Sequence, residues 1–298
     1  MEMVELCPGG LQLSPVVAGV WRMAEWGWDA QQRLRWVEQC MDLGVTSFDH
    51  ADLYGGYSVE GLFGEALALA PALRERMQIV SKCGIRLVCD ARPENRFKHY
   101  DTSAAHITRS VENSLQALRT DHLDLLLIHR PDALMDADAV AGAFAALHAA
   151  GKVRAFGVSN FTPAQFGLLN DRCSLATNPS ELHPVHLAPL TDGTLDQCQR
   201  LRVRPMIWSP LAGGALFNGG DAAAQRVQSA LQSLAQQHGV SAATIAFAWL
   251  LRLPSRPVPI TGSRRIESVR DAVAALDLSL DAQQWNEVWS AATGREVA

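Results

Sequence analysis

The chain has 298 residues, of which 48% are apolar and 19% are charged, and its formal net charge at pH 7 is −5. This composition is typical of a globular protein with a large core, and the negative charge argues against a nucleic-acid-binding surface. No apolar run is long enough to cross a membrane, and the N-terminus lacks a signal-peptide pattern, so we expect a cytoplasmic protein without membrane contacts. The six cysteines form no disulfide-framework or zinc-like pattern and are expected to be reduced.

The predicted elements alternate between strands and helices along the whole chain. Residues 5–13 predict a hairpin around Pro8-Gly9-Gly10. Strands are then predicted at 16–20, 45–48, 78–81, 123–128, 153–158, 175–178, 205–208 and 258–260. Helices are predicted at 29–43, from Ser58 onward, and at 102–119, 136–149, from Pro163 onward, 192–201, 221–238, 241–252, 265–276 and 281–290.

Two stretches show how these assignments are made. In 102–119, Ser103 can cap a helix, and Ile107, Val111 and Leu115 fall on one helical face. The run 123–128 is continuously apolar, as expected of a parallel strand that is buried on both faces.

Eight strand–helix units follow one another without a break in composition, which favours a parallel sheet in one domain over 1–298. We therefore expect an α/β fold, a (β/α)8 TIM barrel with a short N-terminal hairpin and an extra C-terminal helix, in preference to an open doubly wound sheet. No G-x-G-x-x-G follows any strand, so a Rossmann nucleotide-binding domain has no support.

Ionisable residues stand where three of these strands end. Asp49 ends the second strand, Lys82 the third and His129 the fourth, and Tyr54 lies in the loop after the second strand. Singly, each has a simpler explanation, such as a turn-capping carboxylate or a solvated lysine. Together they meet at one mouth of a barrel, where the active sites of this fold are built.

The combination has a chemical logic. A lysine ammonium beside a tyrosine favours the phenolate and should lower the pKa of the phenol, and an aspartate would hold the ammonium in place. A histidine at the same mouth can orient a carbonyl oxygen. This set suits protonation of a carbonyl oxygen while a hydride, which no side chain can supply, attacks the carbon.

At this point the sequence resembles the aldo-keto reductases over essentially its full length. The matching segments are FDHADLYGGY around Asp49 and Tyr54, IVSKCG around Lys82, LDLLLIHRPD around His129, and GKVRAFGVSNF. DHADLYGGY, RVRPMIWSPLAGG and RLPSRPVPITGS are most similar to the bacterial YdhF-type subgroup. The resemblance implies that Tyr54 is the general acid/base, that Lys82 and Asp49 tune it, that His129 positions a small-molecule carbonyl substrate, and that NADPH is the cofactor.

The resemblance also implies cofactor contacts on the later strands. Ser159 and Asn160 match the pair that binds the nicotinamide carboxamide, although they can equally cap the helix at Pro163. Trp208 matches the aromatic ring that stacks on the nicotinamide, although a buried tryptophan needs no function.

Two glycine-containing segments and one strand end complete the expected cofactor site. The loop Ser209-Pro210-Leu211-Ala212-Gly213-Gly214 offers backbone N–H groups to a pyrophosphate, and Gly19-Val20-Trp21 ends the first strand at the same mouth. Gly262-Ser263-Arg264-Arg265 opens a helix, and in the family this segment faces the adenosine 2′-phosphate. A solvated basic turn is the alternative for this last segment.

One residue departs from the family pattern. Pro179 follows Asn178 where the family commonly has a glutamine that contacts the carboxamide, so we expect one lost cofactor contact. The H-x-x-H of His183 and His186 could suggest a metal, but Pro184 lies between them and no third ligand converges, so no metal site is expected.

Two other functions remain open from the sequence. A Schiff-base aldolase would use Lys82 as its nucleophile, and a cofactor-binding regulatory module on the same fold would show little turnover. The identity of the carbonyl substrate depends on loops such as 83–101; Trp21, Trp26, Trp28 and Tyr57 could line its pocket or pack in the core.

Overall fold

The computed structural model describes residues 1–298 and contains one large sheet of eight parallel strands. The order of the strands around the sheet is β10-β11-β12-β3-β4-β5-β8-β9. The strands are β3 (Val17–Gly19), β4 (Ser47–Asp49), β5 (Gln78–Cys83), β8 (Leu123–Ile128), β9 (Val153–Val158), β10 (Ser180–Glu181), β11 (Met206–Trp208) and β12 (Val258–Thr261). Seven lie within two residues of their predicted positions.

The first and last strands in this order, β10 and β9, are brought together by the segment just before β10, which forms backbone hydrogen bonds with β9. Phe156 accepts from the Ala176 N–H at 2.7 Å, and the Val158 N–H donates to Thr177 at 3.2 Å. The expected (β/α)8 barrel is confirmed.

The sixth strand was predicted in the wrong place. It was expected at 175–178, but the regular strand is β10, which pairs with β11 through Ser180 and Glu181. The reason is Pro179, which has no N–H and therefore interrupts the ladder between the two segments.

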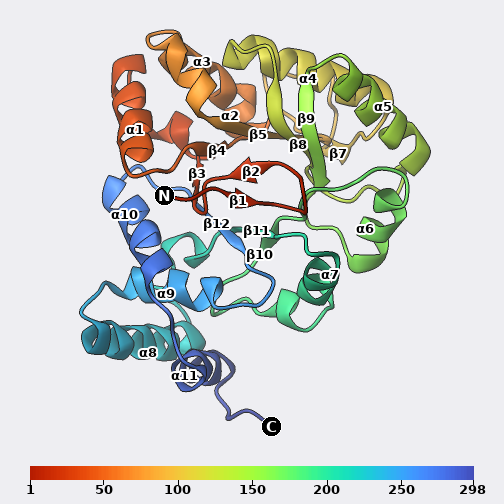
Figure 1. The fold of residues 1–298 in the computed structure, drawn as a ribbon. Coiled ribbons are helices and arrows are strands. Elements are labelled where there is room, and N and C mark those ends of the chain that lie inside the picture. Colours follow the sequence, from red (N-terminus) through yellow and green to blue (C-terminus); the bar gives the residue numbers. More distant parts are fainter.

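Helices surround the barrel on its outside (Figure 1). They are α1 (Ala30–Asp42), α3 (Val59–Leu67), α4 (Ala104–Leu118), α5 (Ala137–Ala149), α6 (Pro163–Asn170), α7 (Thr194–Leu201), α9 (Ala242–Leu251) and α10 (Ile266–Ala274). The start of each helix, and its end where an end was predicted, lies within three residues of the predicted position. The capping residues act as expected: the Ser103 hydroxyl accepts from the His106 N–H at 3.2 Å, and Thr162 and Gln165 form a capping box.

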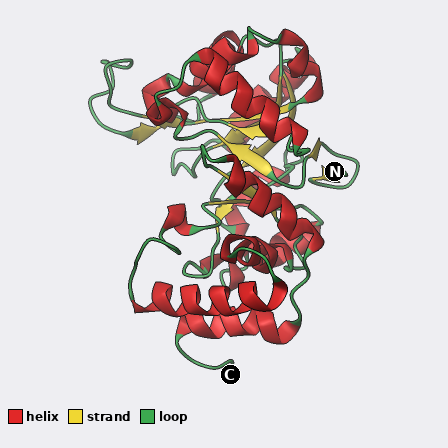
Figure 2. Ribbon diagram, turned by 90° about the vertical axis from the view of Figure 1, so that its left-hand side faces the viewer, coloured by secondary structure: helices red, strands yellow, loops and turns green.

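Two further helices, α8 (Ala222–His238) and α11 (Ala282–Thr293), lie side by side beyond the barrel wall (Figure 2). Trp285 of α11 stacks on Trp249 of α9 with ring centroids 5.0 Å apart. Each indole N–H donates to the backbone oxygen of the other tryptophan, at 3.1 and 3.0 Å. This double contact fixes the predicted C-terminal helix to the barrel. None of the helices has the length and apolar character that a membrane span requires.

The predicted N-terminal hairpin is formed by β1 (Val4–Glu5) and β2 (Gln12–Leu13), which cross the barrel in Figure 1. Leu6 and Leu13 are fully buried and pack with residues that point into the barrel, including Val17, Leu125 and Met206. The hairpin therefore closes the end of the barrel at which the strands begin. The opposite end is left as the mouth.

The segment 83–101, predicted as a long loop, contains a small antiparallel hairpin of β6 (Ile85–Arg86) and β7 (His99–Tyr100). The loop after β4 also differs from the expectation. Tyr54 opens a single helical turn, α2 (Tyr54–Tyr57), whose last three residues have positive φ, and α3 follows after Ser58.

Candidate active site

The structure brings together the four residues predicted at the strand ends. Asp49 is the last residue of β4, Lys82 lies near the end of β5, and His129 follows β8 directly. The Lys82 Nζ lies 2.6 Å from the Asp49 Oδ1 and 3.3 Å from the Tyr54 hydroxyl. The Tyr54 and His129 rings are 6.0 Å apart, edge to face. The mouth therefore holds one continuous group of polar side chains.

Lys82 is the centre of this group. Its ammonium donates to Asp49, to the His50 backbone oxygen at 2.8 Å and to Tyr54, so all three of its hydrogens have acceptors. The side chains of Lys82 and Asp49 are only 5% and 6% exposed. Burial works to lower the pKa of Lys82, but Asp49 and Tyr54 outweigh it and hold that pKa above its ordinary value. Lys82 is thus a charged, fixed ammonium.

The pKa of Tyr54 shifts in the direction opposite to the one predicted. Burial raises the pKa of the phenol above its ordinary value, and Lys82 opposes this shift without reversing it. The sequence reveals the neighbouring lysine but not how completely the phenol is removed from water. At neutral pH the phenol is therefore protonated, which is the form that a proton donor requires.

His129 has the opposite tendency. Burial, and then the charge of Lys82, hold the pKa of its imidazole well below the ordinary value, so the ring is neutral. Its Nδ1 is buried without a protein partner. A neutral imidazole can both donate and accept a hydrogen bond, which suits a role in orienting a carbonyl oxygen.

A hydrogen-bonded chain links three of the residues expected to contact the nicotinamide. The Asn160 amide donates to the Ser159 hydroxyl at 2.7 Å and accepts from the Trp208 indole N–H at 3.0 Å. Asn160 has φ +62°, in the left-handed region, and its own N–H donates to the Pro179 carbonyl at 2.8 Å. Pro179 therefore supports the Ser159–Asn160 turn through its only remaining backbone polar group.

The two segments expected to bind phosphates have free backbone donors. The N–H groups of Ser209 and Leu211, and those of Gly262, Ser263 and Arg264, donate to no protein acceptor. Both arginines, Arg264 and Arg265, are exposed, and α10 begins directly after them. Unused N–H groups and guanidiniums fit the phosphates of a dinucleotide.

The three predicted residues at the end of β3 differ in exposure. The side chain of Val20 is fully buried, and Gly19 lies so close to Ile260 that an added Cβ would be 2.9 Å from its Cγ2. Trp21 is 55% exposed, with the Arg22 guanidinium 5.2 Å from its ring. Only Trp21 of this trio offers a side chain to a ligand.

The remaining aromatic candidates lie in different places. Trp26 is buried and packs on Trp28 and Trp36, at centroid distances of 4.8 and 5.0 Å. The Tyr57 hydroxyl contacts the 83–101 segment through the backbone of Ile85 and Leu87. Trp26 is thus part of the core and not of a substrate pocket.

The H-x-x-H motif forms a local turn. His183 and His186 exchange backbone hydrogen bonds, and the His183 Nε2 lies 3.2 Å from the Glu181 carboxylate. The motif is therefore engaged in its own loop.

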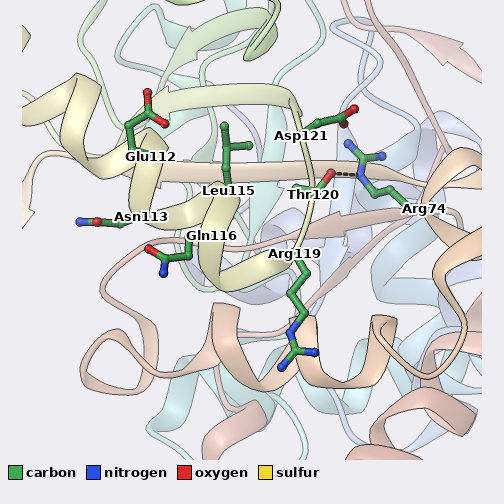
Figure 3. Close-up of a pocket in the computed structure, with 8 residues that line it drawn as sticks. All are labelled: Arg74, Glu112, Asn113, Leu115, Gln116, Arg119, Thr120 and Asp121. Atoms are coloured by element: carbon green, nitrogen blue, oxygen red, sulfur yellow. Dashed lines mark hydrogen bonds between the residues drawn. The ribbon is translucent and has the colours of Figure 1, made fainter.

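A cavity of about 700 Å³ lies elsewhere on the molecule (Figure 3). Arg74 and the end of α4 line it together with the turn that leads into β8, and the Arg74 Nε donates to Thr120 at 2.7 Å. This turn lies where β8 begins, whereas His129 lies where it ends. The cavity is therefore at the closed end of the barrel, away from the mouth.

Two residues near the site were missed from the sequence. The Arg130 guanidinium lies 5.4 Å from the Trp208 ring, and its charge opposes the rise that burial causes in the pKa of Tyr54. The buried Glu60 accepts from the Ser81 hydroxyl at 2.5 Å, directly beside Lys82 in the chain. Arg130 could have been found from the sequence, because it directly follows His129 at the end of a predicted strand. Nothing in the sequence indicated that Glu60 is buried.

Comparison with known proteins agrees with this geometry. Residues 15–292 match the model of the Aldo/keto reductase family. The chain is 54% identical over 300 residues to "Oxidoreductase YdhF" of Escherichia coli strain K12, covering 100% of the chain and 99% of that protein. It is 45% identical over 291 residues to a 6-dehydroglucose reductase of Agrobacterium fabrum, covering 97% of each.

The fold is also that of a solved structure, the glycerol dehydrogenase AKR11B4 from Gluconobacter oxydans. The TM-score is 0.86 and the sequence identity 23%, and the match covers 99% of this chain and 97% of that one. The barrel, its mouth and these relatives define the chain as an enzyme of the oxidoreductase class. More particularly, it belongs to the aldo-keto reductase family, as the sequence motifs indicated.

Proposed function

We propose that the protein is an NADPH-dependent reductase that converts the carbonyl of an aldehyde, ketone or dicarbonyl into an alcohol. The observation that carries this proposal is the contact of the Lys82 ammonium with both Asp49 and the Tyr54 hydroxyl, beside the neutral His129. The names of the relatives support carbonyl reduction in general, and the exposed Arg264 and Arg265 support the phosphorylated cofactor.

In this proposal NADPH, when bound, supplies the hydride to the carbonyl carbon. Ser159, Asn160 and Trp208 hold the nicotinamide end, and the loops at 209–214 and 262–265 hold the phosphates. Tyr54 donates the proton from its hydroxyl to the carbonyl oxygen. The Lys82 ammonium then stabilises the phenolate, and its own charge is held by Asp49. The neutral His129 ring orients the carbonyl oxygen toward Tyr54.

An aldolase mechanism is less well supported by the same geometry. A Schiff-base nucleophile needs a neutral amine with a free lone pair. Here Asp49 and Tyr54 keep Lys82 protonated and engage its hydrogens. The lysine is placed to support another group's chemistry.

The test is a pair of measurements on the wild type and on Tyr54→Phe. Titration with NADPH should quench tryptophan fluorescence in both proteins, since the substitution removes only a hydroxyl. Turnover of a carbonyl panel should fall by about 10²–10⁴-fold in Tyr54→Phe, the usual worth of a positioned general acid. The panel includes 6-dehydroglucose, the sugar named for the Agrobacterium relative.

Substantial turnover by Tyr54→Phe would contradict the assignment of the proton donor. Binding of NADPH without reduction of any carbonyl would instead favour the regulatory module. Failure of the wild type to bind NADPH at tens of micromolar, with its fold intact, would end the proposal.

A further inference from the structure

Tyr57 lies three residues after Tyr54, at the end of an unusual turn. Gly55 and Gly56 have φ of +58° and +64°, and Tyr57 itself has φ +72°. The left-handed region is unfavourable for a bulky residue with a Cβ, and such residues persist only where surrounding contacts hold them. The contacts of Tyr57 therefore need an explanation.

The hydrogen bonds of the Tyr57 hydroxyl and the cation–π contact of its ring all come from the 83–101 segment. Its hydroxyl accepts from the Leu87 N–H at 3.1 Å and donates to the Ile85 carbonyl at 3.4 Å. The Arg92 guanidinium lies over the ring, 4.3 Å from the centroid. One side chain thus joins the loop after β4 to the loop after β5.

The 83–101 segment is itself tied together by side chains. The Asn95 amide donates to the Leu87 carbonyl at 2.7 Å, and Arg86 donates to Asn95 at 3.0 Å. A contact at Leu87 can therefore place the segment as a unit.

This segment lies on the side of the mouth that the substrate would use. The expected nicotinamide contacts come from the ends of β9 and β11, whereas this segment leaves β5 directly after Lys82. Two of its apolar side chains, Val88 and Phe97, are 58% and 65% exposed. A cavity of about 550 Å³, lined by Tyr57 and Arg92 among others, leaves room behind the segment. Without an anchor the segment has space to move.

We propose that Tyr57 is a positioning residue that fixes the 83–101 segment relative to the turn carrying Tyr54, so that a bound carbonyl is held against the proton donor. The part of this inference that concerns the carbonyl rests on the function proposed above. The contacts of Tyr57 with Ile85, Leu87 and Arg92, called the Tyr57 clamp below, are a property of the fold and can be measured separately.

The test uses Tyr57→Phe, which keeps the ring and its contact with Arg92 but removes both hydrogen bonds of the hydroxyl. Tyr100→Phe is the matched control, because Tyr100 lies on the same segment, in β7, and its hydroxyl makes no protein hydrogen bond. Arg92→Gln is a second variant, which removes the contact on the ring face together with a local hydrogen bond from the guanidinium to the Ala91 carbonyl.

Two readouts do not depend on turnover. Hydrogen exchange of the Leu87 amide should become about tenfold faster or more in Tyr57→Phe and stay unchanged in Tyr100→Phe. The chain has three tyrosines, so the ring ¹³Cζ signals can be assigned from the variants. The Tyr54 signal should move in Tyr57→Phe and not in the control.

With an active wild type, kcat/KM for a bulky carbonyl such as phenylglyoxal should fall about fivefold in Tyr57→Phe, because the two lost hydrogen bonds act on the substrate only through the position of the segment. The loss for glyoxal should be smaller, and the Kd of NADPH should stay within about twofold. Arg92→Gln should show the same pattern more weakly.

Unchanged Leu87 exchange together with an unmoved Tyr54 signal would overturn the proposal. An equal loss of NADPH affinity and of kcat/KM would also overturn it, because it would show a general structural effect. If the wild type reduces no carbonyl, the proposed function fails, while the exchange and ¹³C measurements still decide whether Tyr57 couples the two loops.

Discussion

The substitution Lys82→Met would leave the buried carboxylate of Asp49 without its side-chain partner. Asp49 is 4% exposed, and the Lys82 ammonium at 2.6 Å is the only side chain bonded to it. Removing one member of a buried ion pair typically costs about 3–5 kcal/mol, because the other charge stays buried and unpaired. We expect a loss of that size in the free energy of unfolding at pH 8.

The double variant Asp49→Asn/Lys82→Met removes both charges and provides the control. If the two groups act as a pair, its loss should be smaller than the sum of the single losses by about 1–3 kcal/mol. Equilibrium urea unfolding, followed by circular dichroism, measures all four proteins of this cycle.

The dependence on pH adds an independent check. Burial already raises the pKa of Asp49 above its ordinary value, and Lys82 opposes this shift. Without Lys82 the pKa rises further, so the folded protein holds more tightly a proton that the unfolded chain releases. That contribution to stability is present at low pH and is lost as pH rises. The penalty of Lys82→Met should therefore be smaller at pH 5 than at pH 8. Additive single losses, or a loss below about 1 kcal/mol at pH 8, would refute the reasoning.

Three further predictions follow from buried or exposed groups around the site. Burial raises the pKa of Glu60 to about 7, so the protonated side chain contributes stability that is fully present below the unfolded pKa and is lost as pH rises toward 7. In urea unfolding, the wild type should therefore lose about 3 kcal/mol of its free energy of unfolding over this range relative to Glu60→Gln. Replacing both Arg264 and Arg265 by alanine should raise the Kd of NADPH about tenfold and leave that of NADH unchanged, as measured by fluorescence; equal effects would indicate a solvated basic turn. Pro179→Gln should restore a carboxamide contact and lower the Kd of NADPH about fivefold, and an unchanged Kd would show that the proline costs no contact.

The sequence was sufficient to locate the group around Lys82 because the prediction rests on topology. Once the strands are parallel and closed into a barrel, their C-terminal ends must share one mouth, so Asp49, Lys82 and His129 must meet. Capping residues such as Ser103 and Thr162 were equally predictable, because a cap depends on only three or four neighbouring residues.

What could not be predicted depends on balances and contacts between distant segments. The direction of the Tyr54 pKa shift is set by burial against the charge of Lys82, and burial is not readable from spacing. The sixth strand lies at Ser180–Glu181 and not at 175–178, because Pro179 lacks the N–H that a strand needs for pairing. The pairing register of this strand with its neighbours could not be derived from the sequence. The Tyr57 clamp joins residues about thirty positions apart through a left-handed turn, for which no local pattern exists.

The N-terminal hairpin has a consequence for how the protein is made. Leu6 and Leu13 complete their packing only against Met206, Val258 and Ile260, and the Leu6 carbonyl accepts from the Arg204 N–H at 2.7 Å. Leu6 and Leu13 are therefore synthesised well before the strands β11 and β12 that complete their burial. Contacts so distant in sequence slow folding and leave apolar segments exposed meanwhile. We expect completion of the barrel to be a late, post-translational event, with the nascent chain depending on protection until β12 has been synthesised.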